Sequence, residues 1–166
     1  MRSDFIEKDE LGHILFALTP VNRLVCKVAL ETGLRIGDIL SLKTADLQKT
    51  TFTITEQKTG KKKKIRLRDG LRKELLRQSG SFYVFPHRTD ERKHRTRQAV
   101  FSDIKRSAKL FRVKQNISPH SLRKAYSVDL YRKTGDINKV VEALNHDNEL
   151  TTMIYALADI LTKKRG

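Results

Sequence analysis

Apolar residues recur at helical spacing along most of this chain, and this pattern limits it to a mainly α-helical fold. The clearest stretch begins at Pro20 and ends at Gly33. Its apolar positions share one helical face: Val21, Leu24, Val25, Val28 and Ala29. Proline suits a first helical turn, and glycine supplies the left-handed backbone that ends many helices. We therefore expect a helix between these two residues, a sharp break, and a second short helix beginning at Arg35.

The remaining segments predict further helices and a small sheet. Helices are expected after a cap at Asp69 and over residues 96–111, 119–133, 137–144 and 150–161. Residues 51–55 and 64–68 alternate as strands do, and Lys58-Thr59-Gly60-Lys61 between them is typical of a hairpin tip. Residues 82–86 predict a third short strand ended by proline. The expected fold is mainly α with a small antiparallel three-stranded sheet.

One domain spanning residues 1–166 is expected, because the chain has no internal repeat, low-complexity segment or linker rich in proline and glycine. A chain of 166 residues is long enough for a real core. No apolar run approaches the roughly 20 residues of a membrane-spanning helix, and no signal peptide is visible. The single cysteine, Cys26, excludes an internal disulfide and suits a reducing cytoplasm. We expect a cytoplasmic protein without a membrane partner.

The charge balance indicates a polyanionic partner. Lys and Arg number 35 against 19 Asp and Glu, which gives a formal net charge of +16. Such a charge favours phosphate backbones, anionic membranes or acidic proteins. Nucleic acid is preferred among these, since no amphipathic membrane anchor stands out.

Residues 118–123 give the strongest local signal for anion binding. Ser118 suits an N-cap, and Pro119 suits a first helical position. His120 then falls in the first turn, where unpaired backbone N–H groups and the helix dipole favour an anion. Arg123 follows three residues later on the same face. A phosphate could meet both side chains there; the alternative is a surface helix start with a solvated arginine.

Arg35 is a second candidate phosphate ligand, because it follows the break at Gly33. A guanidinium binds two phosphate oxygens at once through its planar fork. Asp38, three residues further, is expected to hold Arg35 in place by a charge-assisted hydrogen bond. The alternative is a local Arg–Asp pair of structural value only.

Basic residues cluster in two stretches that are expected to touch a nucleic-acid backbone. The first follows Lys58 at the hairpin tip and contains Lys61, Lys62, Lys63 and Lys64. The second, residues 88–97, is an expected exposed loop with Arg95 and Arg97. Lys124, next to Arg123, is a further candidate. For both stretches the alternative is a merely solvated run of charges.

Metal and cofactor chemistry find little support in the sequence. A single cysteine and scattered carboxylates give no credible metal site. The chain has no phosphate-binding glycine loop and no serine hydrolase elbow. We expect no cofactor and no small-molecule substrate.

Taken in order, these segments resemble the catalytic domain of the tyrosine recombinase (phage integrase) family from about residue 10 to residue 160. Thr32-Gly33-Leu34-Arg35 is similar to the family's first arginine box. Lys58 falls where the family carries its hairpin lysine, and His120 with Arg123 matches its His-x-x-Arg pair. The motifs are short, but their order and spacing are jointly specific.

The end of the chain resembles the family's last box. His146 and Tyr155 stand nine positions apart, with Thr151-Thr152 between them. Taken alone, Tyr155 would be assigned to the core, because helical apolar spacing surrounds it: Leu150, Ile154, Leu157 and Leu161. The resemblance instead makes Tyr155 the candidate nucleophile.

The resemblance implies a site-specific DNA recombinase or integrase with the DNA breaking-rejoining enzyme fold. Tyr155 would attack the scissile phosphate, form a 3′-phosphotyrosyl link and release a 5′-hydroxyl. Arg35 and Arg123 would clamp the phosphate oxygens, on which charge grows in the transition state. Lys58 would protonate the leaving 5′-oxygen. The reaction would need neither a metal nor a high-energy cofactor.

The two histidines would complete this site. His120 would assist proton transfer with the tyrosine, whose ordinary pKa near 10 leaves it poorly nucleophilic. His146 would donate a hydrogen bond to the phosphate. Asn145 stands where the family usually has glycine, and asparagine is expected to keep the left-handed turn. Asp38 replaces the commoner glutamate.

The resemblance also implies partners and leaves rivals open. Double-stranded DNA is the expected partner, in a bacterial or phage-encoded protein. Self-association on DNA through residues 156–161 is a further expectation, and the family's N-terminal clamp domain is expected to be absent. The alternatives are a type IB topoisomerase-like enzyme and a non-enzymatic DNA-binding module.

Overall fold

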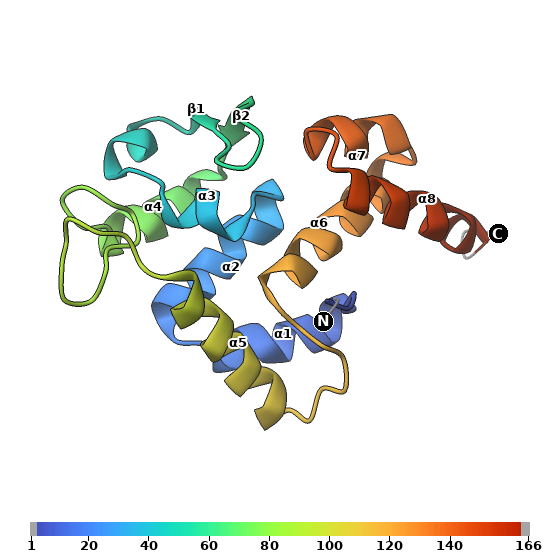
Figure 1. Cartoon of the computed structure of the whole chain (residues 1–166), viewed down its shortest axis with the longest axis horizontal. Helices are drawn as coiled ribbons and strands as arrows, with labels where there is room; N and C mark the ends of the chain where they lie inside the picture. Colours follow the sequence, from blue (N-terminus) through green and yellow to red (C-terminus); the bar gives the residue numbers. More distant parts are fainter. Residues whose placement is uncertain (1–2, 164–166) are drawn as a thin grey trace.

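The computed structural model describes residues 3–163, except the side chains of Ala156 and of residues 159–163. It is mainly α-helical, as predicted (Figure 1). The elements follow one another as α1 (Lys8–Ala17), α2 (Pro20–Thr32), α3 (Ile36–Leu40), the 3₁₀ helix η1 (Thr44–Gln48), β1 (Thr51–Thr55), β2 (Lys62–Arg66), α4 (Asp69–Gln78), α5 (Arg97–Leu110), α6 (Pro119–Thr134), α7 (Ile137–Ala143) and α8 (Asn148–Lys163). No helix in the described range is long and apolar enough to cross a membrane.

Helix α2 is the central element, and both of its ends match the prediction. It begins at Pro20, directly after the N-cap residue Thr19, and ends at the C-cap residue Gly33, whose φ of 67° is left-handed. Helix α6 packs against α2, and a Cβ placed on Gly33 would lie 2.4 Å from the Tyr126 ring of α6. Glycine is therefore required here for its backbone conformation and for the close approach of α6.

The sheet has two strands in the described part of the chain, so the prediction of three is wrong. Strands β1 and β2 are antiparallel, with Thr51 opposite Arg66 and Thr55 opposite Lys62. Residues 82–86 form only isolated bridges at their two ends. Val84 and Phe85 are consecutive and both fully buried. Pro86, at the end of this segment, lacks the N–H donor that would extend a ladder.

The other helix predictions are confirmed within a few residues, with one error in the capping. Thr96 caps α5 by accepting the Ala99 amide. Asp69 was expected to cap α4 but is its first helical residue, with Arg68 at the cap position. The Asp69 carboxylate instead pairs with Arg72 and Lys73 further along the helix.

Two hydrophobic clusters stabilise the fold, and the candidate functional site lies between them. The larger lies under α1 to α5 and includes Cys26, which is fully buried and whose thiol pKa is raised to about 12 by that burial. The smaller joins α6, α7 and α8 through Val128, Val140, Leu150 and Ile154. Figure 1 shows the hairpin, α3 and α4 on one side of the molecule and α7 and α8 on the other.

Candidate functional site

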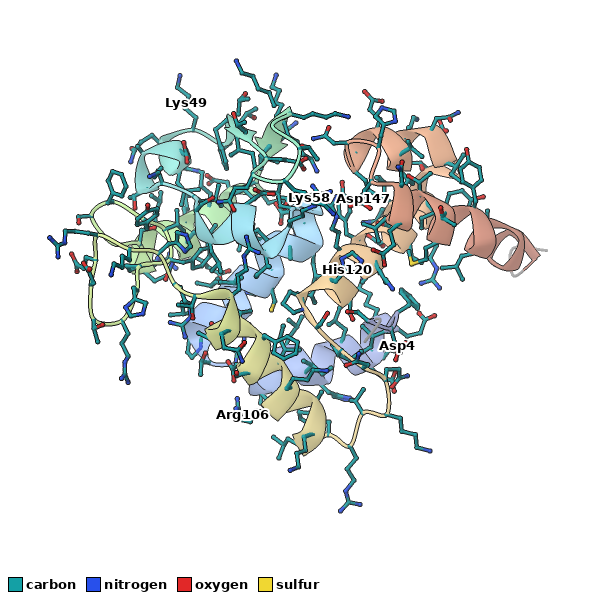
Figure 2. The ribbon with its side chains drawn as sticks, viewed as in Figure 1. Asp4, Lys49, Lys58, Arg106, His120 and Asp147 are labelled. Carbon is teal, nitrogen blue, oxygen red and sulfur yellow. The ribbon has the colours of Figure 1, made fainter. Side chains whose placement is uncertain are left out.

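A cavity of about 720 Å³ lies where these two parts meet. Its lining comes from the start of α3, the β1–β2 hairpin, the first turns of α6 and the turn before α8. Figure 2 shows Lys58, His120 and Asp147 gathered at this place. Four of the six predicted catalytic residues line the cavity: Arg35, Lys58, His120 and Arg123.

Arg123 is the most deeply buried cation of the site, with 1% of its surface exposed. Its Nη1 donates to the Gly33 carbonyl, and its Nη2 donates to the Leu144 carbonyl and to Asp147 Oδ2, both at 3.3 Å. Its Nε is buried and has no hydrogen-bond partner among the described residues. The guanidinium is therefore fixed by the backbone on two sides, and its Nε–H is left unpaired within the described range.

Arg35 occupies the N-cap position of α3 and is held by two carboxylates that the sequence did not suggest. Its Nη1 lies 3.2 Å from Glu56 Oε2, and its Nη2 lies 2.7 Å from Asp147 Oδ2. The prediction that Asp38 holds Arg35 in place is wrong. Asp38 is buried and accepts the Gln57 backbone amide at 2.8 Å, because its side chain faces the hairpin.

Glu56 follows β1 directly, and its side chain is completely buried. Its Oε2 also accepts the Thr59 hydroxyl at 2.8 Å. Burial would raise the pKa of Glu56, but Asn145, Thr59 and the Arg35 charge together lower it. The signal that could have found this residue is the strand period, since Phe52, Ile54 and Glu56 share one face.

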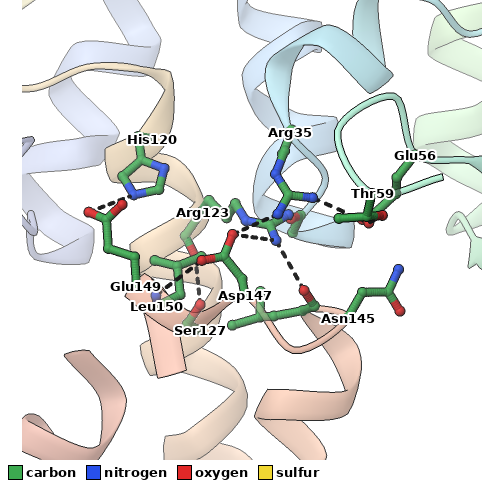
Figure 3. Close-up of polar contacts among 12 residues, drawn as sticks. Arg35, Glu56, Thr59, His120, Arg123, Ser127, Asn145, Asp147, Glu149 and Leu150 are labelled. Carbon is green, nitrogen blue, oxygen red and sulfur yellow. Dashed lines mark hydrogen bonds and ion pairs between the residues drawn. The ribbon is translucent and has the colours of Figure 1, made fainter. Parts of the chain in front are cut away.

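Asp147 lies between the two arginines (Figure 3). Its Oδ2 accepts from Arg35 and Arg123, and its Oδ1 is 3.3 Å from the Leu150 amide in the first turn of α8. Burial would raise the pKa of Asp147, but this amide and the two guanidinium groups lower it. The sequence gives one signal that could have identified Asp147, because aspartate is a preferred residue before a helix.

His120 lies in the first turn of α6, as predicted, but the backbone amides around it are not free. Ser118 Oγ accepts the His120 amide, and Ser121 Oγ accepts the Ser118 amide. A capping box therefore uses donors that were expected to meet an anion. The Nε2 of His120 is 3.5 Å from Glu149 Oε1 (Figure 3). Burial lowers the pKa of His120, and the Glu149 carboxylate opposes this only in part, so the imidazole is mainly neutral at pH 7.

Lys58 is exposed on the hairpin turn and lines the cavity. The turn is closed by two backbone hydrogen bonds between Glu56 and the residues Gly60 and Lys61. Gly60 has a φ of 66°, which glycine adopts without strain. Lys58 is thus carried on a tight turn at the edge of the cavity, next to the buried Glu56.

The predicted DNA-binding lysines separate into two groups. Lys61, Lys62 and Lys64 are exposed, whereas Lys63 points inward and donates to the carbonyls of Thr32 and Ala143 at 3.1 and 2.5 Å. The prediction for Lys63 is therefore wrong. Burial and the nearby Arg123 lower its pKa to about 8. The cause is the strand period, which places Lys63 on the inward face with Ile65 and Leu67.

The other basic candidates also differ in exposure. Lys124 is buried and donates to the Ser3 carbonyl, so its predicted contact with DNA is not supported by its position. Arg95 is half-buried, and its Nε donates to Asn22 Oδ1 at 2.7 Å. Arg97 is exposed, lines the cavity and lies 3.4 Å from Gln57 Oε1.

His146 and Tyr155 do not line the cavity. Asn145 keeps the left-handed turn as expected, with a φ of 51°, and His146 follows with a φ of 58°. The His146 side chain is exposed. Tyr155 is 56% exposed, although its neighbour Ile154 is fully buried. The assignment of Tyr155 to the core, which its apolar surroundings alone suggested, is therefore wrong.

The arrangement is suited to binding one tetrahedral anion. Two fixed guanidinium groups, an exposed ammonium and a neutral imidazole face one cavity. Arg35 and Arg123 supply planar donors, and such donors stabilise charge best where water is largely excluded. Among the described residues, no group of three His, Cys, Asp or Glu side chains is placed to hold a metal ion.

Comparisons with known proteins identify the family and the fold of this chain. The model of the phage integrase family matches residues 4–160. A tyrosine recombinase of Thermosipho africanus is 30% identical over 162 residues, which cover 92% of this chain and 56% of that protein. The crystal structure of XerA recombinase matches with a TM-score of 0.74 at 23% identity, over 98% of this chain and 64% of that one.

A DNA-bound structure shares the fold as well. A lambda integrase dimer, crystallised bound to a COC′ core site, matches with a TM-score of 0.73 at 20% identity, over 92% of this chain and 59% of that one. The chain thus spans little more than half the length of the Thermosipho recombinase and of the lambda integrase chain.

Proposed function

The chain belongs to the phage integrase family, and we propose that it is the catalytic domain of a site-specific tyrosine recombinase. The observation that carries this proposal is the convergence of Arg35 and Arg123 within one cavity, together with Lys58 and His120. These four residues come from three separate elements. Their meeting is what metal-independent transfer of a DNA strand requires.

The proposed reaction joins a tyrosine to the 3′ side of the broken strand. The Tyr155 hydroxyl attacks the scissile phosphate and loses its proton, for which the neutral His120 is the acceptor. The bond to the 5′-oxygen breaks, and Lys58 protonates that oxygen. Arg35 and Arg123 hold the non-bridging oxygens while charge grows on them. A second 5′-hydroxyl then reverses these steps and releases the tyrosine.

Tyr155 lies outside the cavity in this conformation, so catalysis requires a rearrangement. Either α8 moves within one molecule, or Tyr155 enters the cavity of a second copy. The second route agrees with the lambda integrase dimer bound to a core site. We include self-association on DNA in the proposal, with α8 as the segment that mediates it.

The proposed DNA-binding surface surrounds the cavity and is formed by its exposed cations. The group consists of Lys58, Lys61, Lys62, Lys64 and Arg97. Contacts of this kind bind the phosphate backbone without reading sequence, and they weaken as salt displaces them. The proposal therefore specifies double-stranded DNA as the substrate without specifying a target sequence.

A nicked duplex that traps the cleaved intermediate tests this function. The short strand beyond the cleavage point diffuses away, so that cleavage leaves protein covalently attached to DNA. We expect a slowly migrating band in a denaturing gel with the wild-type protein and none with Tyr155→Phe. A band that persists in Tyr155→Phe contradicts the assignment of the nucleophile.

One observation favours a second candidate, a DNA-binding module without turnover. Tyr155 is 56% exposed and lies outside the cavity. Tight binding of DNA with no covalent band on any nicked duplex would favour that candidate. Relaxation of supercoiled DNA without regard to sequence would instead indicate a topoisomerase-like enzyme.

A further inference from the structure

A carboxylate of the protein itself holds the place between the two arginines. Asp147 Oδ2 lies 2.7 Å from Arg35 Nη2 and 3.3 Å from Arg123 Nη2. Glu56 also contacts Arg35, but its side chain is completely buried at the base of the hairpin turn. Among the residues that the structure describes, Asp147 alone bridges both guanidinium groups, and it lines the cavity while Glu56 does not. It therefore occupies the position at which a bound phosphate would meet both arginines.

The same side chain is attached to the helix of the candidate nucleophile. Asp147 Oδ1 accepts the Leu150 amide, and the Asp147 carbonyl accepts the Thr151 amide at 2.9 Å. Both amides lie in the first turn of α8, which carries Tyr155. Movement of the Asp147 carboxylate away from the arginines therefore removes the side-chain acceptor of the Leu150 amide in the first turn of α8.

The turn before Asp147 holds His146 away from the cavity. Asn145 and His146 both have a left-handed backbone, which costs energy for residues other than glycine. His146 is exposed and absent from the cavity lining, whereas the next residue, Asp147, lines it. A change in this strained turn can exchange which of the two side chains faces the arginines.

We propose that Asp147 is an internal substitute for the DNA phosphate, and that phosphate binding expels it and so releases the start of α8. In the resting state the carboxylate pairs with both guanidinium groups and holds them in place. When a phosphate takes over both arginines, the turn relaxes, His146 rotates toward the cavity and α8 becomes free to reposition Tyr155. This inference rests on the proposed function, which explains why α8 would need to be released. Its tests measure phosphate binding and do not depend on that function.

Binding of inorganic phosphate, measured by isothermal titration calorimetry, tests the substitution directly. Asp147→Asn removes the charge and keeps an oxygen that can accept the Leu150 amide. Glu149→Gln is the matched control, because it makes the same change of charge in the same cavity and the same helical turn without contacting either arginine. We expect Asp147→Asn to bind phosphate at least tenfold more tightly than Glu149→Gln. Equal affinities in the two variants, or weaker binding by Asp147→Asn, overturn the proposal.

A double variant places the added affinity at the arginines. The tenfold gain should disappear when Asp147→Asn is combined with Arg35→Gln, because the phosphate then loses one of its two guanidinium ligands. A gain that survives in the double variant would mean that phosphate binds elsewhere, and would overturn the proposal. Circular dichroism of each variant establishes that it is folded.

The wild-type protein provides a measurement that needs no variant at position 147. The imidazole signals of the five histidines can be followed by NMR during a phosphate titration, with His146 assigned from a His146→Gln variant. We expect the His146 signal to shift as the site fills. An unchanged His146 signal at saturating phosphate overturns the coupling of the turn. Neither measurement depends on DNA cleavage, so failure of the recombinase assignment would be seen separately.

Discussion

At the scale of single residues, Gly33 sets the geometry of both arginines. Its left-handed backbone ends α2 and starts the turn that leads to Arg35. Its carbonyl accepts Nη1 of Arg123. Because the Tyr126 ring packs against its Cα, no side chain fits at this position. One backbone position therefore fixes where two charges from distant parts of the chain converge.

Replacement of Gly33 by alanine should destabilise the fold. A left-handed conformation costs roughly 1–2 kcal/mol for a residue with a Cβ, and overpacking against Tyr126 adds about 1–3 kcal/mol. We expect urea unfolding to show a loss of about 2–5 kcal/mol. Gly12→Ala is the control, because Gly12 lies within α1 with nothing within 4 Å of its added Cβ. That variant should gain about 0.5–1 kcal/mol.

Glu56 should make stability depend on pH. Its folded-state pKa is lowered, so its stabilising contribution is present above the ordinary value near 4.3 and is lost as pH falls through the folded value. Glu56→Gln should unfold about 2 kcal/mol more easily at pH 7, and the difference from wild type should shrink below pH 4. The exposed pair of Glu74 with Lys27 provides the control, since Glu74→Gln should change stability by at most about 1 kcal/mol. A difference for Glu56→Gln that stays constant with pH would contradict this account.

Sequence reasoning located the cations of the site better than its anions. Arg35, His120 and Arg123 follow local signals, namely a helix-ending glycine and a helix start. Glu56 and Asp147 reach the arginines only through tertiary packing, over separations of 21 and 112 residues from Arg35. Local spacing favours Asp38 as the partner of Arg35 because the two residues are near neighbours. That spacing cannot show which face of the five-residue helix α3 is buried, and Asp38 is one of its buried residues.

At the scale of elements, the lysine side chains of β2 point alternately outward and inward from the β1–β2 hairpin. Its outward lysines, Lys62 and Lys64, are exposed. Its inward lysine, Lys63, connects the hairpin to the ends of α2 and α7. The strand period was visible in the sequence for Ile65 and Leu67, but the run of four lysines hid its continuation to Lys63. The missing third strand also depends on tertiary packing, because residues 82–86 make only single bridges, to Lys43 and to His94.

The outward lysines should control DNA affinity and its response to salt. Replacing Lys61, Lys62 and Lys64 together by alanine should weaken binding to any duplex. It should reduce the slope of log K against log salt by up to about 2–3, because each lost phosphate contact contributes about 0.9. Fluorescence anisotropy at several salt concentrations measures both quantities. Three exposed lysines away from the cavity serve as the control of equal charge: Lys8, Lys109 and Lys114. If both triple variants lose the same slope, the hairpin is not a binding surface.

Lys63 should behave differently from its neighbours. Lys63→Met leaves the carbonyls of Thr32 and Ala143 without their donor, and each buried unsatisfied group costs about 1–3 kcal/mol. We expect a loss of stability in urea unfolding and little change in the salt slope. A reduced salt slope with unchanged stability would return Lys63 to the DNA-binding surface.

At the scale of the whole molecule, the site lies between the parts built around the two hydrophobic clusters, and α6 joins these parts by packing against α2. Arg35, Lys58 and Glu56 belong to the part that contains the hairpin, and Asp147 belongs to the part built on α6, α7 and α8. The α8 core side chains Leu150 and Ile154 are buried, and Tyr155 faces outward from them. The resemblance could identify Tyr155 as a nucleophile, but its placement depends on how α8 packs. The proposed reaction therefore requires Tyr155 to reach the cavity through a rearrangement, within one molecule or between two copies.

The central claim is that Tyr155 becomes covalently attached to DNA, and peptide mass spectrometry tests it most directly. The protein is incubated with a nicked duplex, digested with trypsin and nuclease, and searched for peptides that carry a nucleotide. The tryptic peptide of residues 140–163 contains Tyr155 as its only tyrosine. We predict that this peptide carries a nucleotide linked through its 3′-phosphate to Tyr155. Attachment to Tyr83, Tyr126 or Tyr131, or a linkage through a 5′-phosphate, would contradict the account.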